Sequence, residues 1–181
     1  MKKLVALLLM LTMLLSTAAL AETTSFDLGL FTLNADSKDN VTVGTKEEGA
    51  VIVSVAPVSD VLDGTDILQL NWTASIISTL PVSVEEFAQL VLDGAIEEME
   101  AQGMTIIDPQ VWIAEFDDET SSMQICYSMT IDYSIAKLDM YFYQLYIPIP
   151  DDGTYLFTLA GDSLDDIQAL LEYIDTHFEV N

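Results

Sequence analysis

The chain has 181 residues, of which 30 are acidic and five are basic, and all five basic residues are lysines. Two of the lysines lie before Ala21 and every acidic residue lies after it, so the 160 residues from Glu22 onward carry three lysines and a net charge of −27. This charge excludes nucleic-acid binding, which depends on lysine and arginine, and disfavours adhesion to anionic lipids. The half-apolar composition excludes disorder, which requires low hydrophobicity as well.

The first 21 residues have the three parts of a secretory signal. Two lysines precede an apolar run over 4–15, and small residues lead to Ala21. We therefore expect a Sec-type signal peptide cleaved after Ala21, and one extracytoplasmic domain over 22–181 that does not insert into a membrane. The alternative is an uncleaved anchor, because a helical apolar run of this length nearly spans a bilayer. Glu22 stands where a lipoprotein needs a cysteine, so we expect a soluble product.

Cys126 is the only cysteine, so the exported chain forms no internal disulfide. This favours a bacterium that does not rely on oxidative folding outside the cytoplasm. No histidine adjoins Cys126 to lower its pKa, and we interpret it as a small strand residue.

The first part of the domain predicts short strands separated by polar turns. The strands are expected over 26–33, 41–45, 51–55 and 67–74. In the last of these, Leu68, Leu70 and Trp72 alternate with polar residues, which is typical of a strand with one buried face.

Two amphipathic helices are predicted. The first begins after Ser83, which with Glu86 forms a capping box, and it ends at Gly103. The second begins after Asp162 or Ser163. The apolar stripes that should face a sheet are Val84, Phe87, Ala88, Val91, Ala95 and Met99 in the first helix, and Leu164, Ile167, Leu171, Ile174 and Phe178 in the second.

Between the helices the pattern predicts an antiparallel meander. The strands are expected over 104–107, 111–116, 123–133, 138–147 and 155–159, with a turn over 148–153. No linker or internal repeat interrupts the chain. The fold class is therefore α+β, an antiparallel sheet with helices packed on it.

The element order resembles that of the PsbP-like α/β/α sandwich family. The segments that carry the resemblance are the helix start Ser83-Val-Glu-Glu-Phe87, then Tyr127-Ser-Met-Thr-Ile-Asp-Tyr133, Tyr143-Gln-Leu-Tyr146, Asp152-Gly-Thr-Tyr-Leu-Phe-Thr158 and the helix end His177-Phe178. The family includes an extrinsic photosystem II protein, a Ran-binding nuclear protein and many exported bacterial proteins. The resemblance implies a sandwich with helices on both sheet faces, and it transfers no functional residue.

Catalytic candidates are few. His177 is the only histidine, and no nucleophile motif accompanies it, so we interpret it as a structural residue at a helix end, where the helix dipole favours a cation. Glu115 and Asp132 are the strand acids with apolar neighbours, and a carboxylate-based hydrolase would need the two to converge. We expect no enzyme activity and no cofactor.

Three acidic clusters are candidates for calcium, which takes clustered oxygens. The candidates are Asp60, Asp63 and Asp66, then Asp117, Asp118 and Glu119, and finally Asp162, Asp165 and Asp166. None has the EF-hand spacing, and helix capping explains the last cluster. The metal prediction therefore rests on Asp117, Asp118 and Glu119, beside a weak, diffuse attraction of divalent cations to the net charge.

Alternation along 141–146 places Tyr141 and Tyr143 on one sheet face and Phe142 and Tyr146 on the other. An uncovered face would expose aromatic rings to a sugar or a partner strand, and the alternative is that helices cover both faces. We expect an exported, non-enzymatic binding or accessory module that acts on a cell-envelope or extracellular protein. The alternatives are a calcium-dependent or glycan-binding module and, third, the hydrolase.

Overall fold

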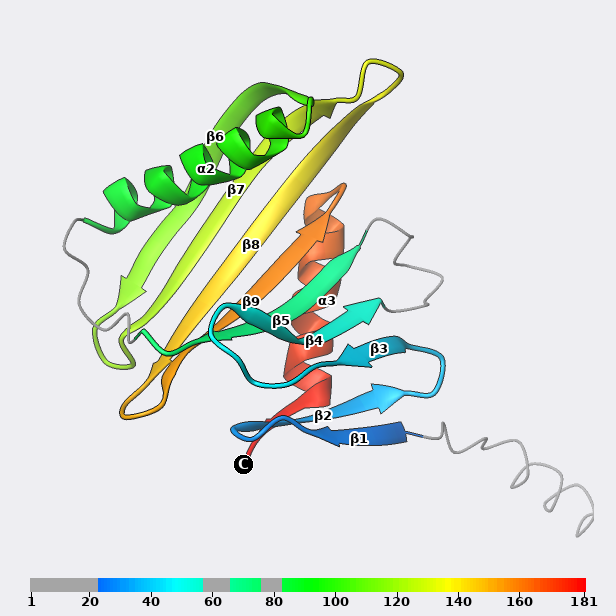
Figure 1. Cartoon of the computed structure of the whole chain (residues 1–181), viewed down its shortest axis with the longest axis vertical. Coiled ribbons are helices and arrows are strands. Elements are labelled where there is room, and N and C mark those ends of the chain that lie inside the picture. Colours follow the sequence, from blue (N-terminus) through cyan, green and yellow to red (C-terminus); the bar gives the residue numbers. More distant parts are fainter. Residues whose placement is uncertain (1–22, 57–65, 76–82) are drawn as a thin grey trace, which may run out of the picture.

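The computed structural model describes residues 23–56, 66–75 and 83–181 (Figure 1). The predictions for the signal peptide, Asp60 and Asp63 lie outside these ranges. Within them the chain forms ten strands and two helices. In chain order these are β1 (Thr23–Asp27), β2 (Phe31–Asp36), β3 (Asn40–Val43), β4 (Ala50–Ala56), β5 (Ile67–Thr73), α2 (Val84–Ala101), β6 (Thr105–Asp117), β7 (Ser122–Asp132), β8 (Lys137–Ile149), β9 (Gly153–Gly161), α3 (Leu164–His177) and β10 (Phe178–Val180).

The strands form two antiparallel sheets. The larger has the order β3-β4-β5-β9-β8-β7-β6, and the smaller has the order β1-β2-β10. The predicted α+β class and antiparallel sheet are confirmed. The second sheet was not predicted, because β10 returns from the end of α3 to pair with β2, the Phe178–Leu33 pair among others.

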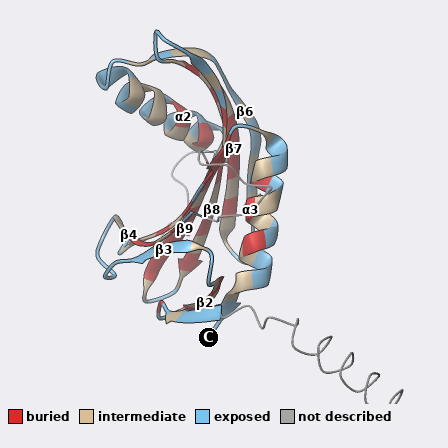
Figure 2. Cartoon of the chain, turned by 90° about the vertical axis from the view of Figure 1, so that its right-hand side faces the viewer, coloured by how far each residue is buried: buried red, intermediate tan, exposed pale blue. Residues whose placement is uncertain are grey.

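The two helices lie on opposite faces of the large sheet (Figure 2). On one face α2 packs against β6 and β7, and its Leu92 is buried in the same core as Ile125 of β7. On the other, α3 packs against β8 and β9 and also contacts β2, burying Leu170 near Phe157. Tyr143 and Tyr146 point into these two different cores and are each 7% exposed, so both faces of β8 are covered there.

Both helices begin with a capping box. In α2 the Ser83 hydroxyl accepts from the Glu86 N–H at 3.2 Å, and the Glu86 carboxylate accepts from the Ser83 N–H at 3.2 Å. In α3 the pair is Ser163 and Asp166, so Ser163 and not Asp162 is the cap. These bonds satisfy N–H groups that have no partner within the helix.

The buried stripes differ in part from the prediction. Leu92 is the most buried leucine of α2, and Leu170 and Tyr173 are buried in α3, although none of the three was assigned to a stripe. Leu164 was assigned and is 53% exposed, because the face of α3 that meets the sheet begins one turn later, at Ile167.

Three predicted strand boundaries are corrected. The strand expected over 26–33 is two strands, because Gly29 adopts φ +86 and its N–H bonds to the Asp27 carboxylate at 2.9 Å, which turns the chain. The pieces over 104–107 and 111–116 join as β6, whose irregular register at Asp108 and Pro109 is tolerated at a sheet edge. Strand β8 continues through Pro148, beyond its last pairing with β7, so the predicted turn is shorter.

Neither α2 nor α3 combines the length with the apolar character that a bilayer crossing requires. The small sheet instead extends the core beneath α3. Phe31 of β2 makes edge-to-face contacts with Tyr155 and Phe157 of β9 and with Phe178 of β10, with ring centroids 5.4, 5.5 and 6.5 Å away. This aromatic cluster fixes the C-terminal end of α3 beside β2.

Candidate functional site

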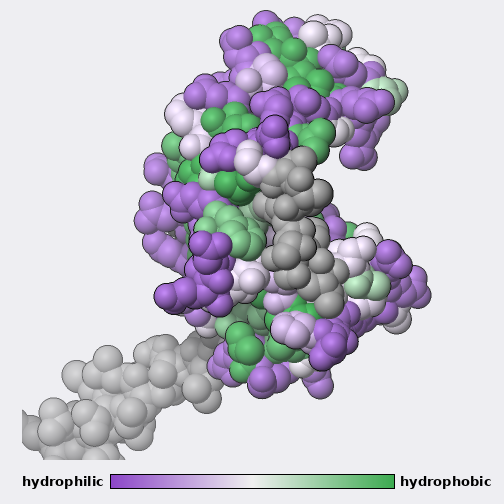
Figure 3. Space-filling model, turned by 90° about the vertical axis from the view of Figure 1, so that its left-hand side faces the viewer, coloured by the Kyte–Doolittle hydropathy of each residue, from purple (hydrophilic) through white to green (hydrophobic). Residues whose placement is uncertain are grey.

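Among the described residues, one face of the large sheet is only partly covered, because helix α2 packs mainly on β6 and β7 (Figure 2). On the surface that Figure 3 shows, hydrophobic residues stand among hydrophilic ones. A cleft of about 530 Å³ lies on this face of the sheet, along the side of α2 that faces β8. This volume lies within the range of about 300–1,000 Å³ that is typical of ligand pockets.

The walls of the cleft are apolar and sulfur-rich. The methionines Met99, Met104 and Met140 line it together with Tyr127 and Phe142, whose rings stack at 4.9 Å. Burial raises the pKa of Tyr127 to about 12, helped by Cys126 and Glu98, so its phenol is neutral at physiological pH.

Among the described residues that line the cleft, one is charged. This residue is Glu98 of α2, which is exposed, and the described lining includes no lysine and no histidine. The other polar contributors are uncharged, among them Gln102, Gln144 and Thr158. The described lining of the cleft therefore combines apolar surface with one negative charge.

A row of uncharged polar side chains continues from the cleft across the sheet. The pairing register places five residues side by side on five consecutive strands: Gln144, Thr158, Gln69, Ser54 and Thr42. Their chain neighbours, such as Leu68 and Leu70, point to the α3 core, so the row faces the α2 side. The Tyr146 hydroxyl donates to Gln144 Oε1 at 2.6 Å, which leaves the Gln144 amide N–H groups for other acceptors.

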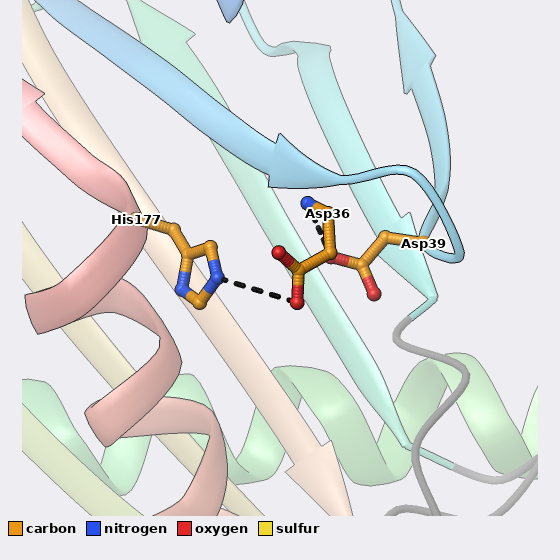
Figure 4. Close-up of side chains that lie close together, drawn as sticks. All are labelled: Asp36, Asp39 and His177. Atoms are coloured by element: carbon orange, nitrogen blue, oxygen red, sulfur yellow. Dashed lines mark hydrogen bonds and ion pairs between the residues drawn. The ribbon is translucent and has the colours of Figure 1, made fainter. Parts of the chain in front are cut away.

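A second cluster joins the β2–β3 turn to the end of α3. Asp36, Asp39 and His177 each offer one ligand atom, and these atoms lie within 4.8 Å of one another (Figure 4). His177 Nε2 lies 3.9 Å from Asp36 Oδ2, and both side chains are half-buried. Asp39 Oδ2 accepts from the Asp36 N–H at 3.1 Å and from the Tyr173 hydroxyl at 2.5 Å.

Tyr173 supports this cluster from within α3. Its ring stacks on the His177 imidazole at 4.0 Å with an angle of 6° between the planes. Burial, followed by the hydrogen bond to Asp39 and the charges of Asp39 and Asp36, raises the pKa of Tyr173 well above its usual value. The phenol therefore stays protonated and remains a donor to Asp39.

The sequence singled out His177 but neither aspartate. Asp36 and Asp39 stand in a segment interpreted only as a polar turn, and they meet His177 through the pairing of β2 with β10. The one local signal was the Asp-x-x-Asp spacing across that turn. The interpretation of His177 as a residue near the end of the last helix is confirmed, because α3 ends at it. Phe178, which was assigned to the apolar stripe of that helix, is instead the first residue of β10.

The predicted hydrolase pair does not converge. Glu115 pairs with Gln124 at one end of β7 and Asp132 lies at the other end, eight residues along the strand. At about 3.4 Å per residue the backbone positions of the two residues are about 27 Å apart along the sheet. Asp132 instead forms an ion pair with Lys137 at 3.7 Å.

Of the predicted calcium candidates, Asp117 is the last residue of β6, and Asp118 and Glu119 follow it in the β6–β7 turn; all three are exposed. The Asp117 carboxylate accepts from the Thr120 hydroxyl at 2.7 Å and from the Glu119 N–H at 2.9 Å. These bonds, the Thr120 one foremost, lower the pKa of Asp117. Both of its oxygens are thus used in shaping the turn, and cation binding there stays a prediction.

The aspartates of the third cluster have different roles at the start of α3. Asp166 completes the capping box and Asp165 is exposed in the first turn, as helix capping predicts. Cys126 is 4% exposed in β7, and burial raises its thiol pKa. This agrees with its interpretation as a structural residue.

A large antiparallel sheet held between two helices defines an α/β/α sandwich, and the chain has the PsbP-like form of it. The solution structure of cyanobacterial PsbP from Synechocystis sp. PCC 6803 is 8% identical in sequence, with 91% of this chain and 96% of that chain covered and a TM-score of 0.52. The Ran-binding protein Mog1p of Saccharomyces cerevisiae is 10% identical, with 88% and 96% covered and a TM-score of 0.42. No model of a protein family matches the sequence, and no curated protein matches it. At these identities the likeness to cyanobacterial PsbP shows the fold alone.

Proposed function

We propose that this protein is an exported, non-enzymatic binding module. Its cleft beside α2 holds a short segment of a cell-envelope or extracellular protein, one that presents apolar side chains together with a lysine or arginine. The observation that carries the proposal is the composition of the cleft, whose described lining residues are largely apolar and include three methionines, with Glu98 as the one charged residue among them.

The chemistry of the walls supports a peptide segment as the occupant. Methionine side chains are flexible and polarisable, so they adapt to apolar side chains of different shapes. The stacked rings of Tyr127 and Phe142 offer a flat apolar surface next to them. A cationic group at the rim would meet Glu98, and the net charge of −27 beyond Ala21 steers cations toward the protein and repels acidic segments.

The same residues argue against catalysis in the cleft. Carboxylate catalysis of glycoside hydrolysis uses two carboxyl groups, and the described cleft residues include one, Glu98. Tyr127 is held neutral, and no serine, cysteine or histidine nucleophile lines the cleft within the described residues.

Export rests on the N-terminal pattern of two lysines, an apolar run and small residues before Ala21. Expression in a bacterial host with Edman sequencing or intact-mass analysis of the exported product tests it. We expect a chain that begins at Glu22, and retention of the first 21 residues would contradict cleavage.

Binding is tested with two synthetic peptides that share leucine and methionine positions and differ in carrying lysines or glutamates. Calorimetry at physiological ionic strength should show saturable binding of the lysine peptide only. Glu98→Gln should weaken that binding about 5-fold, because a partly exposed charge pair contributes about 1 kcal/mol to the binding free energy. Glu97→Gln is the matched control, because Glu97 is exposed on the same helix and does not line the cleft.

A second pair of variants tests the location. Ala95→Phe fills the cleft from α2 and should abolish peptide binding, whereas Ala101→Phe adds the same ring at the exposed end of α2 and should not. Equal binding of both peptides, or equal effects of the two phenylalanine variants, would refute the proposed mode. Self-association of the protein that Ala95→Phe abolishes would instead identify a second copy as the occupant.

Glycan binding is the second candidate, favoured by the uncharged row from Gln144 to Thr42. Amides and hydroxyls at about 4.8 Å spacing, the separation of neighbouring strands, suit the hydroxyl groups of a neutral sugar chain. Binding of neutral oligosaccharides that Gln69→Ala abolishes would support it. Absence of binding from a panel of neutral oligosaccharides would remove it without affecting the peptide proposal.

A further inference from the structure

We propose that Asp36, Asp39 and His177 form a binding site for a divalent cation of the zinc class. The site would tie the β2–β3 turn to the C-terminal end of α3. It is separate from the cleft beside α2 and does not depend on the proposed binding of a partner segment.

The hydrogen bonds of the imidazole prepare one nitrogen to act as a ligand. His177 Nδ1 lies 3.0 Å from the Tyr173 carbonyl oxygen, which can only accept, so Nδ1 carries a proton. The Thr176 hydroxyl, which lies 2.7 Å from Nδ1, donates to the Glu172 carbonyl at 2.8 Å and can accept from the same N–H. In the neutral imidazole the lone pair is therefore on Nε2, which faces Asp36 (Figure 4).

This arrangement is the one that metal-binding histidines use, in which the second ring nitrogen donates to a backbone carbonyl and fixes the tautomer. The stacked ring of Tyr173 further restricts rotation of the imidazole. Nε2 and Asp36 Oδ2 are 3.9 Å apart, which is too long for a hydrogen bond and leaves room for an ion between them.

The two carboxylates complete the set. The Asp39 carboxylate is held in place by the hydrogen bonds that it accepts from the Asp36 N–H and the Tyr173 hydroxyl. Neither of these donors is a ligand atom of the proposed site. The Asp36 carboxylate accepts no hydrogen bond from the described parts of the chain, so its side chain can rotate toward an ion. Tetrahedral zinc holds ligand atoms about 3.4 Å apart, given bonds of about 2.1 Å. His177 Nε2 and Asp36 Oδ2, which are 3.9 Å apart, therefore need to approach by about 0.5 Å, and the other pairs, which lie within 4.8 Å, by at most about 1.4 Å.

The donor types select the metal. Calcium takes six to eight oxygen ligands and magnesium prefers oxygen and water, whereas imidazole with carboxylates suits zinc and its transition-metal neighbours. Two carboxylates and a neutral imidazole also match a dication in charge. The competing arrangement is a direct ion pair between protonated His177 and Asp36, which needs no metal.

Calorimetry of the untagged protein with zinc chloride, in physiological salt and excess magnesium, distinguishes the two. A polyhistidine tag is avoided because it would itself bind zinc, whereas the natural chain has a single histidine, His177. We expect one zinc per chain, and cobalt(II) should give the visible absorption of a tetrahedral complex. His177→Gln, Asp36→Asn and Asp39→Asn should each weaken zinc binding by at least about 10-fold and abolish the cobalt spectrum.

Asp175→Asn is the matched control, because Asp175 is exposed two residues from His177 and its loss changes the charge equally. It should bind zinc like the natural chain. Zinc binding that survives His177→Gln, or calcium binding as tight as zinc, would overturn the proposal, as would loss of binding in Asp175→Asn to the same degree. Because three separate ligand variants are used, one that fails to fold in chelator leaves two that decide the question.

Discussion

Gly153 at the start of β9 should be one of the least replaceable residues of the protein. Its φ of +145 is a conformation that L side chains rarely adopt, and a Cβ there would overlap the Thr73 carbonyl oxygen and lie 2.8 Å from Trp72 Nε1. Backbone strain of about 1–3 kcal/mol and overpacking of about 1–3 kcal/mol add to about 4 kcal/mol for Gly153→Ala. The total free energy of unfolding of a domain of this size is about 5–15 kcal/mol, so this loss is a large part of it.

Gly49→Ala is the matched control. Gly49 also has a positive φ, +70, but no atom lies within 4 Å of a Cβ built on it. Gly49→Ala should therefore lower the free energy of unfolding only by the cost of placing alanine in the left-handed region, about 1 kcal/mol. At about 2–4 °C per kcal/mol, the melting temperature should fall by about 12 °C for Gly153→Ala and about 3 °C for Gly49→Ala.

Urea denaturation followed by circular dichroism measures both free energies of unfolding, and a near-ultraviolet spectrum reports whether Trp72 moves. Gly153→Ala should lower the free energy of unfolding by at least about 2 kcal/mol more than Gly49→Ala does. Equal losses would mean that close approach to Thr73 and Trp72 contributes nothing, and that the packing argument is wrong.

Four further outcomes follow from other contacts. Ser163→Ala, which removes the α3 capping box, should lower the free energy of urea unfolding by about 1 kcal/mol, and an unchanged urea midpoint would contradict this. The buried Cys126 thiol, with its raised pKa, should react with a thiol reagent about 100-fold more slowly than in urea, because only opened molecules expose it; equal rates would show that it is accessible. The Lys46 hydrogen bond lowers the pKa of Asp152, so its stabilisation is present above the unfolded pKa and is lost as pH falls through the folded value. Asp152→Asn should therefore destabilise near neutral pH and converge with the natural chain in acid, whereas a gap that persists in acid would exclude this linkage. Finally, the melting temperature should rise from low to moderate ionic strength, since salt screens repulsion among the acidic residues, and a flat response would show that repulsion is unimportant.

The parts of the fold predicted from the sequence are those with local signals. Strand β7 alternates over eleven residues, and its inward positions from Met123 to Ile131 are buried as expected. The first helix is bounded by the Ser83–Glu86 box and Gly103, both visible in the sequence. For these elements periodicity and capping agree with the tertiary packing, so the local sequence pattern is enough to predict them.

The missing parts depend on contacts between distant segments. A three-residue strand such as β10 has no periodicity of its own, and its pairing with β2 is set by the aromatic cluster around Phe31 and Phe178. Asp36 and Asp39 gain His177 as a neighbour only through that pairing. The cleft likewise follows from how far α2 extends over the sheet, which no residue pattern within α2 specifies.

The two proposed sites lie on different parts of the sandwich and both select positive charge. The cleft with Glu98 is on the α2 face, whereas the cluster with His177 lies at the end of α3, which packs on the other face (Figure 2). Energetic coupling between sites requires an element that both ligands shift between two arrangements. The large sheet lies between the two sites, and no residue belongs to both, so zinc should leave the affinity for the lysine peptide unchanged. Competition between them would show instead that both cations are held by the diffuse field of the acidic surface, with neither site being specific.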